Sequence, residues 1–268
     1  MTVNLVPDDL WDRIAPLLPV RPRRHRHPGR LPVPDQVALA GVVCVLRKGV
    51  AWRDVPSEVV GCSGVTAWRR LRDWTEAGVW PRLHAALLTE MRRAGLLELD
   101  DCAVDGSHVR ALKRGDHVGP SPVDRARPGS KHHLIVDRHG TPLAVTLTGG
   151  NRHDVTRLLP LLDAVPPIRG RRGRPRTKPR RLYADRGYDF DKYRRLWWKR
   201  GIKPMIAHRG VAHGSGLGKV RWVVERAFAW LHQFKRLRIR YERRADLHQS
   251  LLELACSITA LRRLRKAQ

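Results

Sequence analysis

Residues 102–109, Cys-Ala-Val-Asp-Gly-Ser-His-Val, begin the part of the chain that decides the fold, because a short apolar run there ends on a carboxylate and a glycine. A run of this kind, bounded by a turn residue, predicts a strand. Two more strands are predicted at 131–137 and 143–148, one on each side of the turn His139-Gly140. Three strands in succession therefore open this half of the chain.

Helical and strand patterns alternate after these three strands. Helices are predicted at 154–165, 191–200, 219–234 and 245–264, and short strands at 182–185 and 203–207. The order strand-strand-strand-helix-strand-helix-strand-helix predicts an α/β unit, a mixed sheet covered by helices. It is the order of a ribonuclease H-like fold.

Three carboxylates stand where functional side chains gather in such a sheet. Asp105 and Asp185 each close a short apolar strand, and Glu225 lies in the amphipathic stretch 220–226. Adjacent parallel placement of the two strands would bring the aspartates together. Carboxylates so placed can hold two Mg²⁺ ions that clamp the attacking and leaving oxygens of a phosphodiester. Taken singly, each has a plainer explanation: a turn-forming aspartate, or a solvated ion pair between Glu225 and Arg221.

The helix that carries Glu225 adds two candidate cations. Arg221, Glu225 and His232 lie within about 40° of one another at ~100° per residue. We therefore expect Arg221 and His232 to face phosphates bound at the metals. A neighbouring apolar stripe is predicted to fix this helix to the sheet, and it consists of Val220, Val224, Ala227, Leu231 and Phe234.

The N-terminal part of the chain is predicted to be helical. A short helix within residues 1–20 is followed by the basic, Pro-rich segment 21–30, which is interpreted as a linker or an arm that contacts a nucleic-acid backbone. A further helix runs from Asp35 to Gly49. We place a boundary here between a helical DNA-binding domain, residues 1–95, and a catalytic domain, residues 96–268.

A second helix of this N-terminal domain is predicted from Ser63, its capping residue, to about Glu76. Arg69 and Arg70 share one face of it, and Val65, Trp68 and Leu71 share another. Two interpretations remain open. The pair of helices is a helix-turn-helix that reads DNA through the two arginines, or it is a small bundle whose arginines are merely solvated.

The composition favours a polyanionic partner. The chain has 53 Lys and Arg against 25 Asp and Glu, a formal net charge of +28, and nucleic acid is the first candidate for such a charge. No apolar run approaches the roughly 20 residues that span a membrane, and no secretory signal is visible. The four cysteines are isolated, which is typical of a reduced cytosol and makes a zinc site unexpected. We expect a cytoplasmic, nucleoid-associated protein.

The most basic segment, residues 169–181, contains no acidic residue. Its core Arg172-Gly-Arg-Pro-Arg176 resembles an extended hook that can lie in a narrow, AT-rich minor groove, with Arg172, Arg174 and Arg176 as the contacts. The alternative is a disordered loop that attracts phosphates in general. Lys131-His132-His133 suggests a metal site, but structural roles within a strand are the preferred explanation. Asn151 and Asp154 are predicted to cap the following helix.

Taken in order, the motifs of the whole chain resemble those of the DDE transposases of bacterial insertion sequences, in the insertion-sequence-five group. The residues that carry the resemblance are Gly49-Val-Ala-Trp-Arg-Asp-Val-Pro56, Trp68-Arg-Arg-Leu-Arg-Asp-Trp74, Val104-Asp-Gly-Ser-His108, Gly119-Pro-Ser-Pro-Val-Asp124, Gly129-Ser-Lys-His-His133, Gly149-Gly-Asn-Arg-His-Asp154, Ala184-Asp-Arg-Gly-Tyr-Asp189, Arg221-Trp-Val-Val-Glu225 and Arg236-Leu-Arg-Ile-Arg-Tyr-Glu-Arg-Arg244.

The resemblance implies a ribonuclease H-like catalytic domain that depends on Mg²⁺ or Mn²⁺, with the triad at Asp105, Asp185 and Glu225. It also implies cutting and joining of double-stranded DNA at terminal inverted repeats and in target DNA, by a homo-oligomer assembled on the DNA. Related transposases carry a Tyr and a Lys around the glutamate. Here Gly218 and His232 stand at those positions, so the strand contacts assigned to that Tyr and Lys are not carried over.

The leading function is therefore a transposase that hydrolyses a phosphodiester and then uses the freed 3′-OH as nucleophile. The alternatives are a site-specific nuclease on the same fold and a non-catalytic DNA-binding protein, against which the intact triad argues. Some relatives close the excised end as a hairpin with a flipped base held by aromatic residues. We predict ends freed without a hairpin, because segment 210–218 has no aromatic residue and nothing between Asp185 and Glu225 is expected to restack a base.

Overall fold

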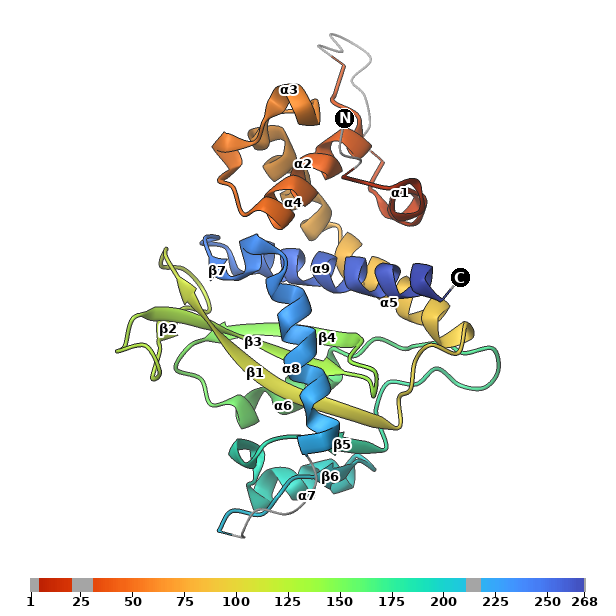
Figure 1. Ribbon diagram of the computed structural model, residues 1–268, viewed down its shortest axis with the longest axis vertical. Helices are drawn as coiled ribbons and strands as arrows, with labels where there is room; N and C mark the ends of the chain where they lie inside the picture. The colour runs from red at the N-terminus through yellow and green to blue at the C-terminus, as the bar shows by residue number, and fades with distance from the viewer. Residues whose placement is uncertain (1–4, 21–30, 211–217, 268) are drawn as a thin grey trace.

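A mixed sheet forms the centre of the fold, as the alternation of elements predicts. The computed structural model describes residues 5–20, 31–210 and 218–267, and Figure 1 shows the sheet below a layer of N-terminal helices. The strands are β1 (Asp101–Ala111), β2 (Gly119–Pro120), β3 (Pro128–Val136), β4 (Pro142–Gly149), β5 (Arg181–Tyr183), β6 (Lys203–Met205) and β7 (Ile239–Arg240).

The order of the main strands in the sheet is β4-β3-β1-β5-β6. β3 runs antiparallel to both β1 and β4, whereas β1, β5 and β6 are mutually parallel. An antiparallel meander extended by two parallel strands beside its first strand is the ribonuclease H-like arrangement. The predicted fold class is thus confirmed, although β5 ends at Tyr183, two residues before Asp185.

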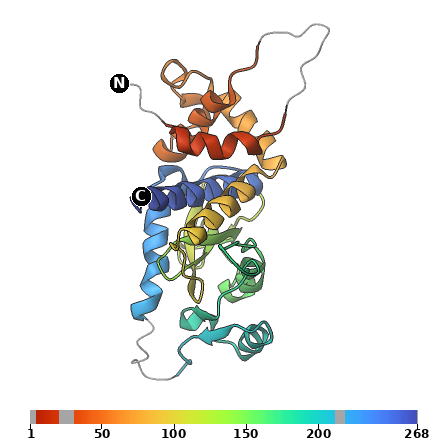
Figure 2. The same ribbon diagram turned by 90° about the vertical axis from the view of Figure 1, so that its right-hand side faces the viewer.

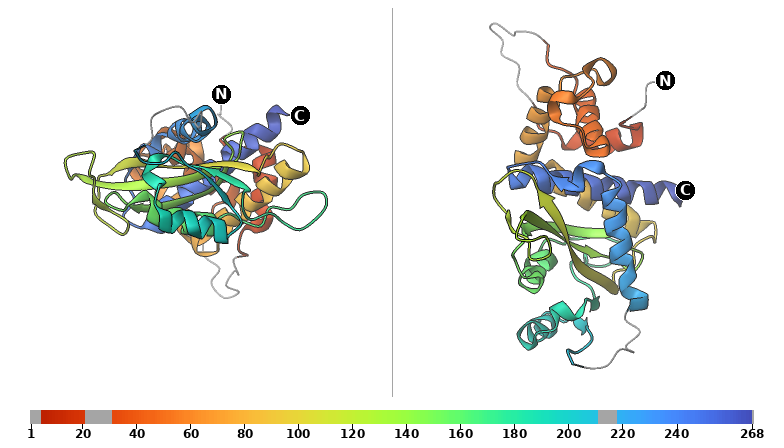
Figure 3. Two further views of the ribbon diagram at one scale, coloured as in Figure 1. Left: turned by 90° about the horizontal axis from the view of Figure 1, so that it is seen from below. Right: turned by 60° about the vertical axis from the view of Figure 1, so that its left-hand side comes forward.

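Helices cover both faces of this sheet. Those of the catalytic half are η3 (Asp154–Arg157), α6 (Leu158–Asp163), η4 (Arg186–Tyr188), α7 (Asp191–Lys199), α8 (Gly218–His232), η5 (Lys235–Leu237) and α9 (Ala245–Lys266). Side chains alternate along β1, so that Ala103 packs in the hydrophobic cluster of α8 and α9 while Val104 packs in that of α6 and α7. Figure 3 shows α8 and α6 on opposite sides of the strands.

The predicted apolar stripe fixes α8 to the sheet. Val224, Ala227, Leu231 and Phe234 are buried, and Val220 packs against the same cluster while remaining partly exposed. This stripe therefore sets the rotation of α8 about its axis, and with it the direction in which Glu225 points.

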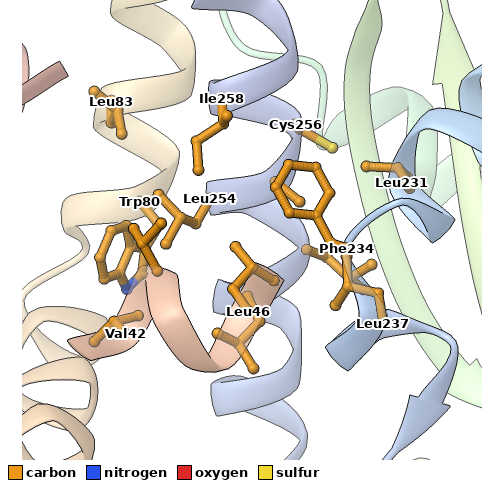
Figure 4. Packing of buried hydrophobic residues seen from close by; sticks show 14 of the residues in the cluster. Val42, Leu46, Trp80, Leu83, Leu231, Phe234, Leu237, Leu254, Cys256 and Ile258 are labelled. Atoms are coloured by element: carbon orange, nitrogen blue, oxygen red, sulfur yellow. The ribbon is translucent and has the colours of Figure 1, made fainter. Parts of the chain in front are cut away.

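The N-terminal helices are α1 (Asp8–Ile14), α2 (Asp35–Lys48), α3 (Ser57–Val60), α4 (Gly64–Glu76) and α5 (Val79–Arg93), with the single turns η1 (Ala15–Leu17) and η2 (Trp52–Asp54). They stack above α9, with α5 running alongside it (Figure 2). Val42, Trp80 and Leu254 belong to one buried cluster at this junction (Figure 4). The hydrophobic core therefore continues across the predicted boundary at residue 95, and the division into two domains stays a prediction.

The structure has a helix, α5, at residues 79–93, where no element is predicted from the sequence. This helix follows α4 after two residues, starts at Gly78 without a capping side chain, and carries Pro81 in its first turn, so the usual start signals are weak. Ser63 does cap α4, since its Oγ accepts a hydrogen bond from the Thr66 amide at 3.2 Å. The predicted apolar face of α4 is partly wrong: Ala67, Leu71 and Trp74 are buried, but Val65 is 54% exposed.

Two further predictions concern parts of the chain outside the sheet. The basic arm at 21–30 lies outside the residues that the structure describes. In the described ranges, no helix has the length and apolar character needed to cross a membrane.

Candidate active site

The parallel pairing of β1 with β5 brings the two predicted aspartates to the same level, with Asp105 within β1 and Asp185 just after β5. Ala103 is the register partner of Tyr183. Two residues further along the chain stand Asp105 and Asp185, so the two residues are level with each other. The prediction that Asp105 closes its strand is wrong, because β1 continues to Ala111. Burial raises the pKa of Asp105, and the charge of Asp185 adds to this rise. The first two members of the predicted triad are therefore neighbours.

Asp105 is a carboxyl group with few partners. Burial raises the pKa of Asp105 to about 6, because an apolar surrounding disfavours the charged form. The Gly106 amide donates to its Oδ1 at 2.8 Å and opposes this rise. The neighbouring charges of Asp185 and Asp154 increase it, and that of Arg221 decreases it. A positive charge placed between these carboxylates would relieve their repulsion.

Arg221 links Asp105 to the third predicted member of the triad. Its Nη1 lies 3.4 Å from Asp105 Oδ2, and its Nη2 lies 3.2 Å from Glu225 Oε1. The i,i+4 spacing on α8 allows one guanidinium to reach both carboxylates. The Glu225 side chain is 60% exposed, so it can turn on the outer surface of the helix without disturbing the core.

The donor set suits a hard divalent cation. Asp185 Oδ1 is buried and accepts no hydrogen bond from the described residues, and an unpaired buried oxygen is costly unless a donor or an ion satisfies it. Within the described ranges, no three His, Cys, Asp or Glu side chains converge closely enough to bind a metal. Glu225 is held by Arg221 instead of meeting the two aspartates, and its 60% exposed side chain has room to rotate.

His232 lies at the other end of α8, in a partly buried position. Burial is the main cause that lowers its pKa, with the charge of Arg238 adding to it. Its Nε2 is buried and has no hydrogen-bond partner among the described residues. His232 also acts on the buried His132 electrostatically, so it borders the interior, and its contact with phosphates stays a prediction.

Lys131, His132 and His133 have structural partners, as the preferred interpretation predicted. Within β3, His132 Nε2 lies 2.9 Å from His248 Nε2, and His133 Nε2 lies 2.7 Å from Thr148 Oγ1. Lys131 Nζ lies 3.0 Å from Asp154 Oδ1. The predicted capping role of Asp154 is wrong, because this residue makes no cap hydrogen bond and its carboxylate is held by β3 instead.

The two arginines predicted to read DNA from α4 differ in their surroundings. Arg69 is exposed, whereas Arg70 Nε lies 3.0 Å from Asp35 Oδ1 and its side chain is only 13% exposed. Both line a groove of about 630 Å³ with the first turn of α4 and the chain at 31–33. Arg69 is thus available to an outside partner, and Arg70 is held by a contact within the protein.

The basic loop at 169–181 is closed at its base. Ile168 and Arg176 form an isolated antiparallel bridge, and Arg176 Nη1 donates to Asp100 Oδ1 at 2.6 Å. Gly173 has a φ of +83°, so the predicted extended form of the hook is wrong at that residue. Arg172 and Arg174 are exposed at the tip.

One premise of the hairpin prediction is wrong, namely that nothing between Asp185 and Glu225 can restack a base. Trp198 is 56% exposed and Trp222 is 48% exposed, and both lie between Asp185 and Glu225. Trp222 is on α8 three residues before Glu225, with the Arg226 guanidinium 4.3 Å from its ring centroid. Exposed aromatic surface is therefore available near the site, while residues 211–217 of the Gly-rich segment lie outside the described ranges.

Comparisons with known proteins agree with this geometry. Residues 98–260 match the family described as "Transposase DDE domain", and residues 6–84 match "Putative transposase of IS4/5 family". A Burkholderia cepacia protein, "Putative transposase for insertion sequence element IS402", is 62% identical over 150 residues, which make up 56% of this chain and 71% of that protein. A second one, "Insertion element IS402 uncharacterized 16.2 kDa protein", is 50% identical over 124 residues, 46% of this chain and 84% of that protein.

Among solved structures, the Mos1 mariner paired end complex with Mn aligns with 92% of this chain and 82% of that chain, at 9% sequence identity and a TM-score of 0.32. The Mos1 strand transfer complex covers 90% of this chain and 81% of that chain, with 12% identity and a TM-score of 0.24. TM-scores of this size do not define the fold, which is defined by the order of the strands.

Proposed function

Since the chain belongs to the transposase DDE domain family, we propose that it binds the terminal inverted repeats of an insertion sequence, cuts the DNA there and joins the freed ends to target DNA. Membership of the family makes it a nuclease and strand transferase. The observation that carries the proposal is the parallel pairing of β1 with β5. In its register Asp105, within β1, is level with Asp185, two residues beyond the end of β5, and Arg221 contacts both Asp105 and Glu225.

The proposed catalytic groups are Asp105, Asp185 and Glu225, which would hold two Mg²⁺ or Mn²⁺ ions. When bound, such ions lower the pKa of the attacking water or 3′-OH and stabilise the charge on the pentacovalent phosphate. Asp105 and Asp185 are fixed by the sheet and set the position of the site. Glu225 completes it by rotation on α8.

Arg221 is proposed to change partners when the site fills. It neutralises Asp105 and Glu225 across the 3.4 and 3.2 Å contacts. Once cations occupy that role, its guanidinium is free to bind a non-bridging phosphate oxygen of the DNA, for which its planar fork is suited. Arg221 would thus pair with carboxylates when DNA is absent and with a phosphate when DNA is bound.

DNA recognition is assigned to two exposed basic regions. Arg69 on α4 faces the groove of about 630 Å³, and Arg172 and Arg174 lie at the tip of the basic loop. We propose these three as direct DNA contacts. Arg70 and Arg176 support them by fixing α4 to Asp35 and the loop to Asp100. Two copies of the chain would bring two ends together in a homo-oligomer on DNA.

Cleavage of end-labelled inverted-repeat DNA in Mg²⁺ tests the proposal. Asp105→Asn, Asp185→Asn and Glu225→Gln should each abolish cleavage while binding of the DNA persists, since each change removes a ligand charge and leaves the proposed recognition surface intact. Asp163→Asn is the matched control, because this carboxylate is 60% exposed and pairs only with Arg200 among the contacts of the described residues. Cleavage by one triad variant at the wild-type rate would remove that residue from the site.

A strand-transfer assay with pre-cleaved ends separates the proposed transposase from a nuclease on the same fold. Joined products indicate a transposase. Cleavage without any joining would instead favour the nuclease.

A further inference from the structure

A cavity of about 680 Å³ lies where β4 ends. Its walls come from the last residues of β4, the loop that follows, η3, and residues 117 and 118 before β2. None of the described residues that line it is acidic. Its polar and cationic lining residues include Arg152, Arg157, His117, His153, Asn151 and Thr148.

Two arginines give the cavity its charge. Arg152 is exposed, and Arg157 is half-buried at the end of η3. Neither makes an ion pair with a residue that the structure describes. The Nε–H of Arg157 is buried and has no acceptor within the same ranges. A buried N–H without a partner is costly, so a ligand that accepts hydrogen bonds would stabilise this site.

The carboxylate nearest to these arginines in the sequence is already neutralised. Lys131 Nζ lies 3.0 Å from Asp154 Oδ1, and it also donates to the Arg152 carbonyl at 2.8 Å. The ammonium group thus ties the loop to β3 and occupies the one acid close in sequence to Arg152 and Arg157. The positive charge of the cavity is therefore left for a ligand.

Glycines allow the chain before β2 to form part of the cavity wall. A Cβ atom on Gly149 would lie 3.0 Å from Asn151 Oδ1 and 3.3 Å from the Gly119 amide nitrogen, and one on Gly119 would overlap Asn151 Oδ1. The Asn151 side chain is thus packed against the backbone of two segments that lie far apart in the sequence. This packing fixes the wall that carries it.

His117 is held at the cavity in a strained conformation. Its φ of +57° is left-handed, which costs free energy in a residue other than glycine. The buried Arg240 fixes it, since Nη1 donates to the His117 carbonyl at 2.9 Å and Nη2 to the Asp116 carbonyl at 2.6 Å. Ser130 Oγ donates to the same His117 carbonyl at 2.7 Å. Strain that several partners enforce is typical of binding sites.

We infer that this cavity binds a phosphate group of a DNA backbone, with Arg152 and Arg157 as its cationic ligands. A guanidinium presents paired N–H groups that match two phosphate oxygens. His117 and Asn151 are further hydrogen-bond donors in the same cavity. The inference rests on the proposed function, and it adds a phosphate contact outside the carboxylates, α4 and the basic loop.

Two substitutions remove the charge with different consequences for packing. Arg152→Gln changes an exposed side chain, and Arg157→Met keeps the apolar stem of a half-buried one. Binding of the full-length protein to labelled duplexes of repeat and of random sequence is measured by fluorescence anisotropy over a series of NaCl concentrations. Each substitution should reduce the slope of log K against log[NaCl] by about 0.9, the value for one phosphate contact. Both duplexes should be weakened to the same extent, because a phosphate carries no sequence information.

Arg195→Gln is the matched control, since Arg195 is exposed on α7, and α7 contacts β6 at the other edge of the sheet. It removes the same charge and should leave the slope unchanged. The unfolding temperature of each variant shows whether it is folded.

Duplexes in which single phosphates are replaced by neutral methylphosphonates give a second measurement. At one position at least, the replacement should weaken binding by the wild type about tenfold, the order expected for a charged hydrogen bond. The same replacement should have no further effect on Arg157→Met, because the contact has already been lost.

The outcomes separate this inference from the proposed function. Wild-type slopes in both cavity variants, or an equal reduction in Arg195→Gln, overturn the inference, and the proposed function stands if cleavage of repeat DNA still requires Asp105. Inorganic phosphate at matched ionic strength tests the other source of the ligand. If it raises the unfolding temperature of the wild type but not of Arg152→Gln, while the salt slopes are unchanged, the cavity binds free phosphate and the inference is overturned.

Discussion

Acidic side chains near the two ends of α8 meet opposite environments. Beyond its C-terminal end, Glu242 Oε1 accepts hydrogen bonds from Arg236 Nε at 2.9 Å and Nη2 at 2.7 Å, and His248 Nδ1 lies 3.2 Å from its Oε2. Beside its N-terminal end, Asp105 has one backbone donor and a longer contact to Arg221. Glu242 has close partners on both of its carboxylate oxygens, whereas Asp105 has one close donor and one longer contact.

The titration of the two acids reflects that difference. Burial acts against ionisation in both. The hydrogen bond from His248 and the charge of Arg236 nevertheless lower the pKa of Glu242 to about 2, whereas burial and the charge of Asp185 raise the pKa of Asp105 to about 6. An acid whose partners are complete holds the fold together, and an acid whose partners are missing is available to a ligand.

The Glu242 cluster also joins the two halves of the chain. Arg236 Nη1 donates to the Val50 carbonyl at 2.9 Å, directly after α2, and its guanidinium lies 5.9 Å from the Trp52 ring. On the other side, His248 reaches His132 of β3 at 2.9 Å. The arrangement ties the N-terminal helices to the sheet through buried polar contacts.

Breaking the Glu242 cluster should have the largest effect on stability. Glu242→Gln removes the charge that pairs with Arg236 and should lower the free energy of unfolding by about 3–5 kcal/mol, the range for breaking a buried ion pair. Chemical denaturation measures it. Glu76→Gln is the control, since Glu76 pairs with Arg244 but is 57% exposed, and it should cost less than about 1 kcal/mol. Equal losses in the two variants would contradict the structural role of Glu242.

Glu253 is a third acid for this comparison, because it is partly buried and has no cationic partner among the residues that the structure describes. Burial raises the pKa of Glu253 to about 7 from its ordinary value of 4.5, and the Gln249 amide, which donates at 3.0 Å, opposes this only partly. A raised acid pKa destabilises the folded state at pH above 7, and this cost disappears as the pH falls to about 4.5.

Glu253→Gln should therefore stabilise the protein by roughly 2 kcal/mol at pH 8 and change little at pH 4. The measurement is denaturant unfolding of both proteins at the two pH values. A stabilisation that is the same at pH 4 and pH 8 would show that the carboxylate charge is not its cause. The predicted result would also show that a raised pKa alone does not mark a functional acid.

The sequence predicted the parts of the site that depend on local pattern. Asp105 and Asp185 each follow an apolar run in the sequence, and the pairing of β1 with β5 sets them level with each other. Glu225 and Arg221 follow from helical spacing. The buried stripe on α8 was equally visible, because a period of 3.6 residues depends on nothing outside the helix.

The parts that depend on pairing between distant segments were not visible. Asp154 was predicted to cap a helix, and only the pairing of β1 with β3 shows that it lies against Lys131 and close to Gly106. Arg70 and Arg176 looked free, since their partners Asp35 and Asp100 are far along the chain. Side-chain partners of this kind are set by tertiary packing, which sequence pattern does not encode locally.

Thermal unfolding with and without Mn²⁺ tests the central claim, that open carboxylates mark the site and enclosed ones hold the fold. Wild-type protein should gain about 2.7 kcal/mol at a Mn²⁺ concentration of 100 times the dissociation constant. Glu242→Gln should unfold at a lower temperature yet keep the Mn²⁺ gain. Asp105→Asn should unfold no earlier than the wild type without metal and gain nothing from Mn²⁺. The claim is contradicted if Mn²⁺ still stabilises Asp105→Asn, or if Glu242→Gln alone is no longer stabilised by Mn²⁺.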